Sequence, residues 1–86
     1  MAFRVITNSS RECYKALGII HKKYSYIHGR FKDFISSPKS NGYRSLHTSV
    51  FGPMNKKIEV QFRSNAMEQI AQFGVAAHWK YKEKPS

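Results

Sequence analysis

The chain has 86 residues with a formal net charge of +10, and 41% of its residues are hydrophobic. This length allows one domain or part of one, and the apolar content is enough for a modest core, which argues against a disordered chain. The positive charge favours polyanionic partners such as nucleotide phosphates, RNA, DNA or an anionic membrane surface, although a merely solvated basic surface would have the same composition.

A single cysteine, Cys13, excludes a disulfide framework and a cysteine-based metal site. The histidines lack the close pairing that zinc motifs show. No apolar run approaches the length of a membrane helix, and the N-terminus lacks the layout of a signal peptide. We therefore expect a cytoplasmic chain without a membrane partner.

The first part of the chain predicts a strand followed by a helix. Residues 2–7 are β-branched and aromatic, which is typical of a short strand, and because nothing precedes this strand we expect the chain to be cut from a larger domain. Ser9 and Glu12 have the spacing of a capping box at the start of a helix that runs to about Tyr24. Four apolar residues at helical spacings form its inner stripe: Cys13, Leu17, Ile20 and Tyr24.

A long loop and a β-hairpin follow. Residues 25–44 contain Gly, Pro and several Ser residues and predict a loop with one helical turn at residues 30–35, and such a long irregular segment is uncommon unless it is functional. Residues 45–63 predict a hairpin with its turn at residues 52–56. One face of the hairpin is apolar and holds Leu46, Thr48, Val50, Ile58, Val60 and Phe62. The opposite face holds His47, Ser49, Glu59, Gln61 and Arg63.

The end of the chain predicts one more helix, which Ser64 and Asn65 can cap. Its inner stripe is expected to hold Met67, Ile70, Gly74 and Ala77. The tail at residues 80–86 is charged and is expected to fray. The predicted order is strand, helix, loop, β-hairpin and helix, which places the chain in the α/β class.

Glu59 is the acidic residue with the least ordinary explanation, because it lies on a strand whose other face is buried. A carboxylate beside basic loops suits Mg²⁺, which takes one or two carboxylates together with substrate phosphates. The alternative is a salt bridge to Arg63 or to a hairpin lysine.

Tyr43 lies between cations just before the hairpin. A loop tyrosine in this setting can stack on a base, although a core or hinge role is also open. Four cations flank it and could contact phosphates or simply be solvated: Arg30, Lys32, Lys39 and Arg44. His47 could donate to a phosphate or a ribose, or could be an ordinary strand histidine.

Four ordered motifs carry a family resemblance: GRFKDFI at residues 29–35, PKSNGYRSLHT at 38–48, IEVQFR at 58–63 and GVAAHWKYK at 74–82. They resemble the synthetase domain of the RelA/SpoT family, whose members make guanosine tetra- and pentaphosphate. The resemblance implies a nucleotidyltransferase-like mixed sheet flanked by helices, of which residues 1–86 would be the acceptor-nucleotide half. The implied reaction transfers pyrophosphate from ATP to the 3′-hydroxyl of GDP or GTP with the help of Mg²⁺.

The resemblance also implies site residues. It assigns the following to the acceptor GDP or GTP: Arg30, Lys32, Lys39, Asn41, Tyr43, His47 and Gln61. Tyr43 would stack on guanine, and Lys32 would lie near the phosphates in a motif like that of the bifunctional synthetase/hydrolase members. Glu59 would be the catalytic and metal-site acid, and it is a candidate for activating the 3′-hydroxyl. No residue of this chain is assigned to ATP.

In the family, a second metal-binding Asp and most residues that grip ATP lie upstream of the matching segment. We therefore expect this chain to bind Mg²⁺ weakly, to bind ATP only with a complementing partner, and to be inactive alone while retaining guanine-nucleotide binding. Two alternatives stay open: a small basic module that binds RNA or another polyanion, and a chain that self-associates through its first strand.

Overall fold

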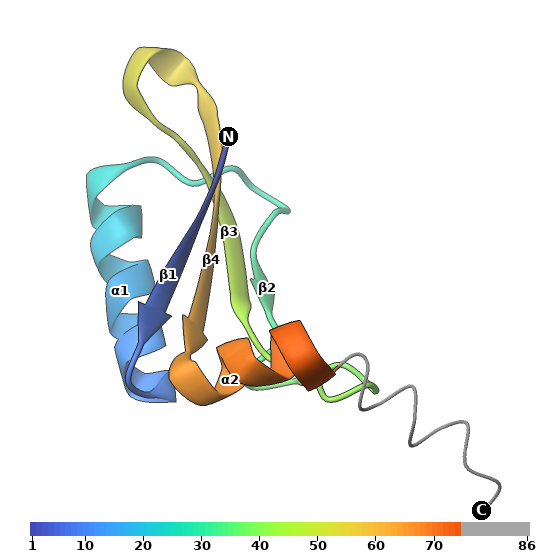
Figure 1. The fold of residues 1–86 in the computed structure, drawn as a ribbon. Coiled ribbons are helices and arrows are strands. Elements are labelled where there is room, and N and C mark those ends of the chain that lie inside the picture. Colours follow the sequence, from blue (N-terminus) through green and yellow to red (C-terminus); the bar gives the residue numbers. More distant parts are fainter. Residues whose placement is uncertain (75–86) are drawn as a thin grey trace, which may run out of the picture.

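The computed structural model describes residues 1–74 of the chain. Along these residues lie β1 (Ala2–Thr7), α1 (Ser10–Lys23), β2 (Lys32–Asp33), β3 (Leu46–Phe51), a 3₁₀ turn (Pro53–Asn55), β4 (Lys57–Ser64), α2 (Asn65–Gln69) and a π-helical turn (Ile70–Gly74). The strands form one mixed sheet in the order β1-β4-β3-β2, with α1 beside it and α2 directly after β4 (Figure 1). The predicted α/β class is confirmed.

The register of the sheet decides which side chains share a face. β1 runs parallel to β4, with Ala2 opposite Glu59. β3 runs antiparallel to β4, with His47 opposite Gln61, so the predicted hairpin is confirmed. Because side chains alternate along a strand, one face of the sheet is apolar and the other is polar.

The apolar face packs against α1, and Met67 of α2 joins the same cluster. Leu46, Phe62 and Cys13 have no exposed surface, and Val60 and Met67 are nearly as buried. Burying a side chain of this size stabilises the fold by about 1.5–3 kcal/mol, so this cluster is the main source of stability.

The limits of α1 follow the predicted signals. The Ser9 hydroxyl oxygen accepts a hydrogen bond from the Glu12 amide at 3.2 Å, which caps the first turn. At the other end, Tyr24 is the C-cap, and its amide donates to the Ile20 carbonyl. Cys13 is the most buried residue of the predicted stripe.

The predicted helical turn at residues 30–35 is wrong. Lys32 and Asp33 instead form β2, which pairs with His47 and Leu46 on the outer edge of β3. Pairing with the free edge of β3 gives hydrogen-bond partners to backbone N–H and C=O groups that a single helical turn would leave without partners. The turn comes after β2, where the Asp33 carboxylate accepts hydrogen bonds from the amides of Ile35 and Ser36.

The final helix begins as predicted but does not keep its expected stripe. Ser64 is the N-cap, and its hydroxyl accepts from the Met67 amide at 3.2 Å. Ile70 is 43% exposed instead of facing the core, because the helix widens into a π-helical turn there and a count of 3.6 residues per turn no longer applies. The expected place of Ala77 and the frayed tail at 80–86 lie outside the described residues.

Within residues 1–74, no helix combines the length and the apolar character needed to cross a membrane.

Candidate functional site

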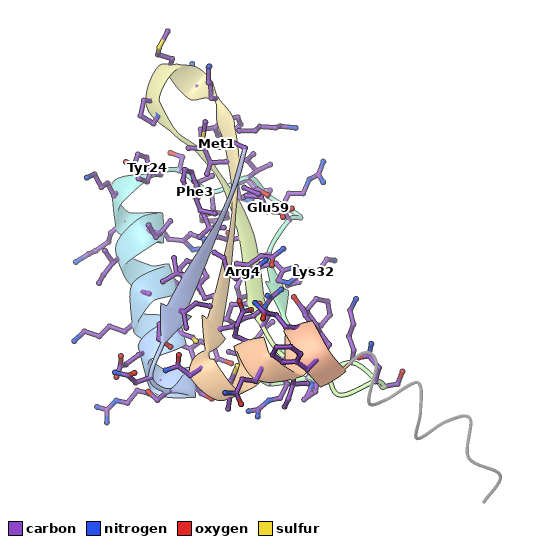
Figure 2. The ribbon with its side chains drawn as sticks, in the orientation of Figure 1. Met1, Phe3, Arg4, Tyr24, Lys32 and Glu59 are labelled. Atoms are coloured by element: carbon purple, nitrogen blue, oxygen red, sulfur yellow. The ribbon has the colours of Figure 1, made fainter. Side chains whose placement is uncertain are left out.

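The polar face of the sheet gathers the chemistry-bearing side chains. Arg4, Lys32 and Glu59 come from three different strands and lie on the side of the sheet away from α1 (Figure 2). His47 and Gln61 stand opposite each other between them. Residues far apart in the sequence thus reach one surface through strand register alone.

A pocket of about 330 Å³ opens on this face. Its lining includes four of the residues that the sequence assigned to the site: Arg30, Lys32, His47 and Glu59. Two cations and one carboxylate therefore converge in a space large enough for a phosphorylated group and a hydrated cation. The arrangement can bind phosphate oxygens through charge-assisted hydrogen bonds.

The wall of this pocket is built by a bulge in the chain beside β3. The amide of Ile27 donates to the Ser49 carbonyl at 2.7 Å, and Tyr26 forms a bridge with Val50. β2 resumes the pairing further along β3, so residues 28–31 protrude between the two attachment points. Gly29 permits this turn with a φ of +83°, a conformation that other residues rarely adopt.

Tyr43 lies next to this pocket and is joined to it by His47. The Tyr43 hydroxyl and His47 Nε2 are 2.8 Å apart. The Phe34 ring meets both rings edge to face, at centroid distances of 6.0 Å to Tyr43 and 5.3 Å to His47. Lys39 Nζ lies 5.6 Å from the centre of the Tyr43 ring, within the range of a cation–π contact.

Asn41 shapes the loop that presents Tyr43. Its side-chain oxygen accepts from the Tyr43 amide at 2.9 Å, and the amide of Gly42 donates to the Lys39 carbonyl. These bonds close a tight turn, so Asn41 supports the position of Tyr43 whatever else it contacts. The structure thus brings Lys39, Asn41, Tyr43 and His47 together in one cluster.

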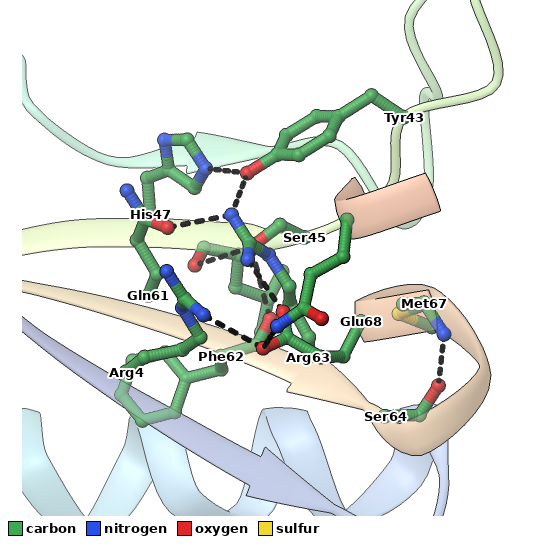
Figure 3. A network of polar contacts seen from close by, with 12 residues as sticks. Arg4, Tyr43, Ser45, His47, Gln61, Phe62, Arg63, Ser64, Met67 and Glu68 are labelled. Atoms are coloured by element: carbon green, nitrogen blue, oxygen red, sulfur yellow. Dashed lines mark hydrogen bonds and ion pairs between the residues drawn. The ribbon is translucent and has the colours of Figure 1, made fainter. Parts of the chain in front are cut away.

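Arg63 and Glu68 were not among the predicted site residues, yet they hold this cluster from below (Figure 3). Arg63 Nη2 donates to the Tyr43 hydroxyl and to Gln61 Oε1, both at 2.6 Å. Arg63 Nη1 forms an ion pair with Glu68 Oε1 at 2.7 Å, and Arg4 binds the other oxygen of Glu68 at the same distance. The only feature of the sequence that pointed to this role was the expected place of Arg63 on the polar face of the hairpin.

The alternative salt bridge between Glu59 and Arg63 is wrong. The ion pairs within the described residues join Glu68 to Arg63 and to Arg4. Glu59 instead accepts a hydrogen bond from Gln61 Nε2 at 3.2 Å and is otherwise open to solvent.

These contacts shift the ionisation of three groups. Burial lowers the pKa of His47, as do the positive charges of Arg63 and Lys39, although Glu59 acts in the opposite direction. Burial alone would raise the pKa of Glu68, but its hydrogen bonds from Arg63 and Arg4 outweigh burial and lower it. Burial alone would lower the pKa of Arg63, but its bonds to Tyr43 and Glu68 raise it. The lowered pKa favours the neutral imidazole of His47 at pH 7, whereas Glu68 is ionised.

Glu59 fits the role of a single Mg²⁺ ligand. Among residues 1–74 it is the one carboxylate that lines the pocket, whereas Asp33 and Glu68 are engaged by other partners. Among residues 1–74, no group of three His, Cys, Asp or Glu side chains could hold a metal by itself. A cation bound here would therefore depend on the oxygens of a phosphate ligand as well as on Glu59.

Sequence comparison shows relatives of this chain. A family model described as "Region found in RelA / SpoT proteins" matches residues 1–86. The GTP pyrophosphokinase of Myxococcus xanthus is 52% identical over 83 residues, which are 96% of this chain and 11% of that protein. The bifunctional (p)ppGpp synthase/hydrolase SpoT of Escherichia coli K12 is 56% identical over 82 residues, which are 95% of this chain and 12% of that protein.

Solved structures share the fold. Small alarmone synthetase 1 of Bacillus subtilis, bound to its product pppGpp, superposes with a TM-score of 0.72 at 21% identity, over 96% of this chain and 46% of that one. Small alarmone synthetase 2 of the same organism gives a TM-score of 0.72 at 28% identity, over 96% and 49%. The expected nucleotidyltransferase-like fold is confirmed, although the chain spans less than half of these proteins. Motifs, sheet order and relatives agree, and the chain belongs to the RelA/SpoT family.

Proposed function

We propose that this chain carries the acceptor-nucleotide part of a guanosine tetra- and pentaphosphate synthetase and binds GDP or GTP. One observation carries the proposal: His47 lines the pocket that holds Arg30, Lys32 and Glu59, and the same ring contacts Tyr43. A flat aromatic surface and a charged pocket therefore adjoin each other. A nucleotide has this same division into a base and a phosphorylated sugar.

Each part of the site has a distinct task in this proposal. The Tyr43 ring stacks on guanine, a contact that contributes roughly 1–3 kcal/mol in proteins that bind single-stranded nucleic acid. Arg30 and Lys32 hold the phosphates. The neutral His47 offers hydrogen bonds without adding a third charge to the pocket.

Glu59 is the proposed metal ligand and a candidate base for the 3′-hydroxyl. Mg²⁺, when bound, would neutralise the charge that develops during pyrophosphate transfer from ATP. Gln61 donates to Glu59 Oε1 and so fixes the direction of that carboxylate. Because Glu59 is the single carboxylate among the described pocket residues, we propose that Mg²⁺ binds weakly and that transfer from ATP requires a complementing partner.

Calorimetric titration of GDP, with ADP as the control nucleotide, tests the proposal. The buffer should contain Mg²⁺ at physiological salt. GDP is expected to bind more tightly than ADP, and Tyr43→Ala is expected to weaken GDP binding by about 5- to 150-fold, the equivalent of one lost stacking contact. Phe51→Ala is the matched control, because Phe51 is an exposed aromatic residue of β3 that lies outside the pocket lining.

Equal binding of both nucleotides would overturn the proposal. If that binding also fell steeply as the salt concentration rose, and single-stranded RNA bound in the same way, the chain would be a polyanion-binding module. Conversion of ATP and GDP by the pure chain would contradict the need for a complementing partner.

A further inference from the structure

Arg63 is the most buried charged residue that the structure describes, with 7% of its surface exposed. Burying a guanidinium group is costly unless partners compensate for the lost hydration. The two Nη atoms have three partners, but Nε has none within residues 1–74. An apolar side chain at position 63 would avoid the cost of burying the guanidinium group. The role of Arg63 therefore lies in its contacts with Tyr43, Gln61 and Glu68.

The geometry of the Tyr43 hydroxyl defines a direction for its hydrogen. A guanidinium can only donate, so the hydroxyl oxygen accepts from Arg63 Nη2. His47 Nε2 is the other described partner of this hydroxyl, and burial favours a neutral imidazole that can accept there. Donation of the phenol hydrogen to His47 Nε2 satisfies both hydrogen bonds, and it requires that His47 carry its own hydrogen on Nδ1.

Arg63 also restrains the ring of Tyr43. Its Cζ lies 5.2 Å from the ring centre, so one residue contacts both the hydroxyl and the π-surface. Lys39 is the other cation near this ring, but it is exposed and can move away when a base arrives. Arg63 cannot do so, because Glu68 and Gln61 hold its two Nη atoms.

We propose that Arg63 is a positioning residue that fixes Tyr43 for guanine, and that Glu68 of α2 acts on Tyr43 through Arg63. The inference rests on the proposed function for its ligand, but its geometry can be tested without any nucleotide. It also means that α2 and the base-stacking ring are mechanically joined, since Glu68 receives Arg63 on one oxygen and Arg4 of β1 on the other.

Nitrogen NMR of the His47 ring tests the geometry. The full chain is expected to show one His47 tautomer, with hydrogen on Nδ1. Arg63→Lys keeps the charge but cannot reach three partners with a planar fork, so both tautomers should appear. Glu68→Gln should also allow both tautomers, although Glu68 contacts Arg63 and not the His47 ring itself. Lys57→Gln removes a charge from an exposed position of the same strand and should leave the tautomer unchanged.

Titration of GDP and ADP tests the functional part. Arg63→Lys and Glu68→Gln are each expected to weaken GDP binding by about fivefold or more, because each breaks a charge-assisted hydrogen bond, while ADP binding stays the same. Circular dichroism confirms the fold of each variant. If Arg63→Lys does not fold, Glu68→Gln decides the outcome alone.

The outcomes separate the two claims. A folded variant that keeps both the single tautomer and the GDP affinity of the natural chain would overturn the positioning role. If the natural chain does not distinguish GDP from ADP, the proposed function fails, and the tautomer measurement alone decides whether Arg63 fixes Tyr43. Loss of GDP affinity with an unchanged tautomer would show that Arg63 acts in another way and would also reject the inference.

Discussion

At the scale of single residues, Glu59 and Arg63 show how backbone geometry separates two side chains of one face. They are four residues apart on β4, which corresponds to roughly 13 Å along a strand at 3.3 Å per residue. The same spacing on a helix would place the two side chains within reach of each other. Arg63 pairs with Glu68 because β4 runs directly into α2, which brings Glu68 back over the sheet. Glu59 is thereby left available for a ligand.

The two shifted histidines predict a loss of stability in mild acid. Burial lowers the pKa of His21 and, together with Arg63 and Lys39, that of His47, both below the ordinary value of 6.5. The unfolded chain therefore binds protons at a higher pH than the folded chain does. The free energy of unfolding should be highest above pH 6.5 and should fall as the pH decreases through the lowered pKa values of the folded state.

Urea unfolding at about pH 7.5 and about pH 5.5 measures this effect, since the interval spans the histidine range. His47→Gln should unfold with a smaller difference between the two conditions, because one of the two titrating groups is gone. Asp33 and Glu68 also have lowered pKa values, but their ordinary values of 3.8 and 4.5 place their contribution at lower pH. A urea midpoint that rises in acid would contradict the prediction.

At the scale of elements, the loop between β2 and β3 is held by specific contacts despite its length. Asp33 anchors its start, because the carboxylate accepts from the Tyr14 hydroxyl of α1 as well as from the turn amides. Asn41 and Gly42 close its far end in front of Tyr43. A functional loop without regular structure thus gains its order from side chains that satisfy backbone groups.

Two glycine substitutions should change stability in opposite directions. Gly42 has a φ of +86°, so Gly42→Ala is expected to cost about 1–2 kcal/mol. Gly18 lies inside α1 with open space where the methyl group of an alanine would lie, so Gly18→Ala should stabilise the chain by about 0.5–1 kcal/mol. Chemical denaturation of both variants gives the comparison, and equal effects at the two positions would refute it. Gly42→Ala should also weaken GDP binding, whereas Gly18→Ala should not.

At the scale of the whole molecule, the apolar side of the sheet is incompletely covered. A groove of about 610 Å³ lies between the β1 edge, the end of α1 and the hairpin turn. Phe3 on its border is 52% exposed, and Met54 at the hairpin turn is 90% exposed. β1 is also the last strand on its side of the described sheet, so its outer edge offers backbone groups for pairing.

Self-association through β1 remains a prediction that follows from these surfaces. Sedimentation at rising protein concentration should give an increasing average mass. Phe3→Lys should reduce that increase, because a charge at the strand edge opposes pairing. Ile19→Lys on the exposed face of α1 is the control and should have no effect, since Ile19 does not line the groove. A chain that stays monomeric at its highest soluble concentration would rule out this mode of association.

The sequence by itself determined the elements whose signal is local. The apolar stripe of α1, the alternation of β3 and β4 and the serine caps follow from backbone periods and hydrogen-bonding needs that act over a few residues, and the structure contains each of them. The motifs also named the pocket residues Arg30, Lys32, His47 and Glu59.

Only the tertiary structure decided which groups meet. β2 forms because β3 offers an edge to Lys32 and Asp33, a fact that the local sequence does not contain. In the sequence, Glu68 has the pattern of an ordinary helix residue. In the folded chain, α2 lies beside β1 and β4, and Glu68 forms ion pairs with Arg4 and Arg63. Ion pairs and hydrogen bonds depend on distances of a few ångströms between side chains, and those distances are set by packing of the whole chain. The support beneath Tyr43 is therefore a property of the fold and not of any motif.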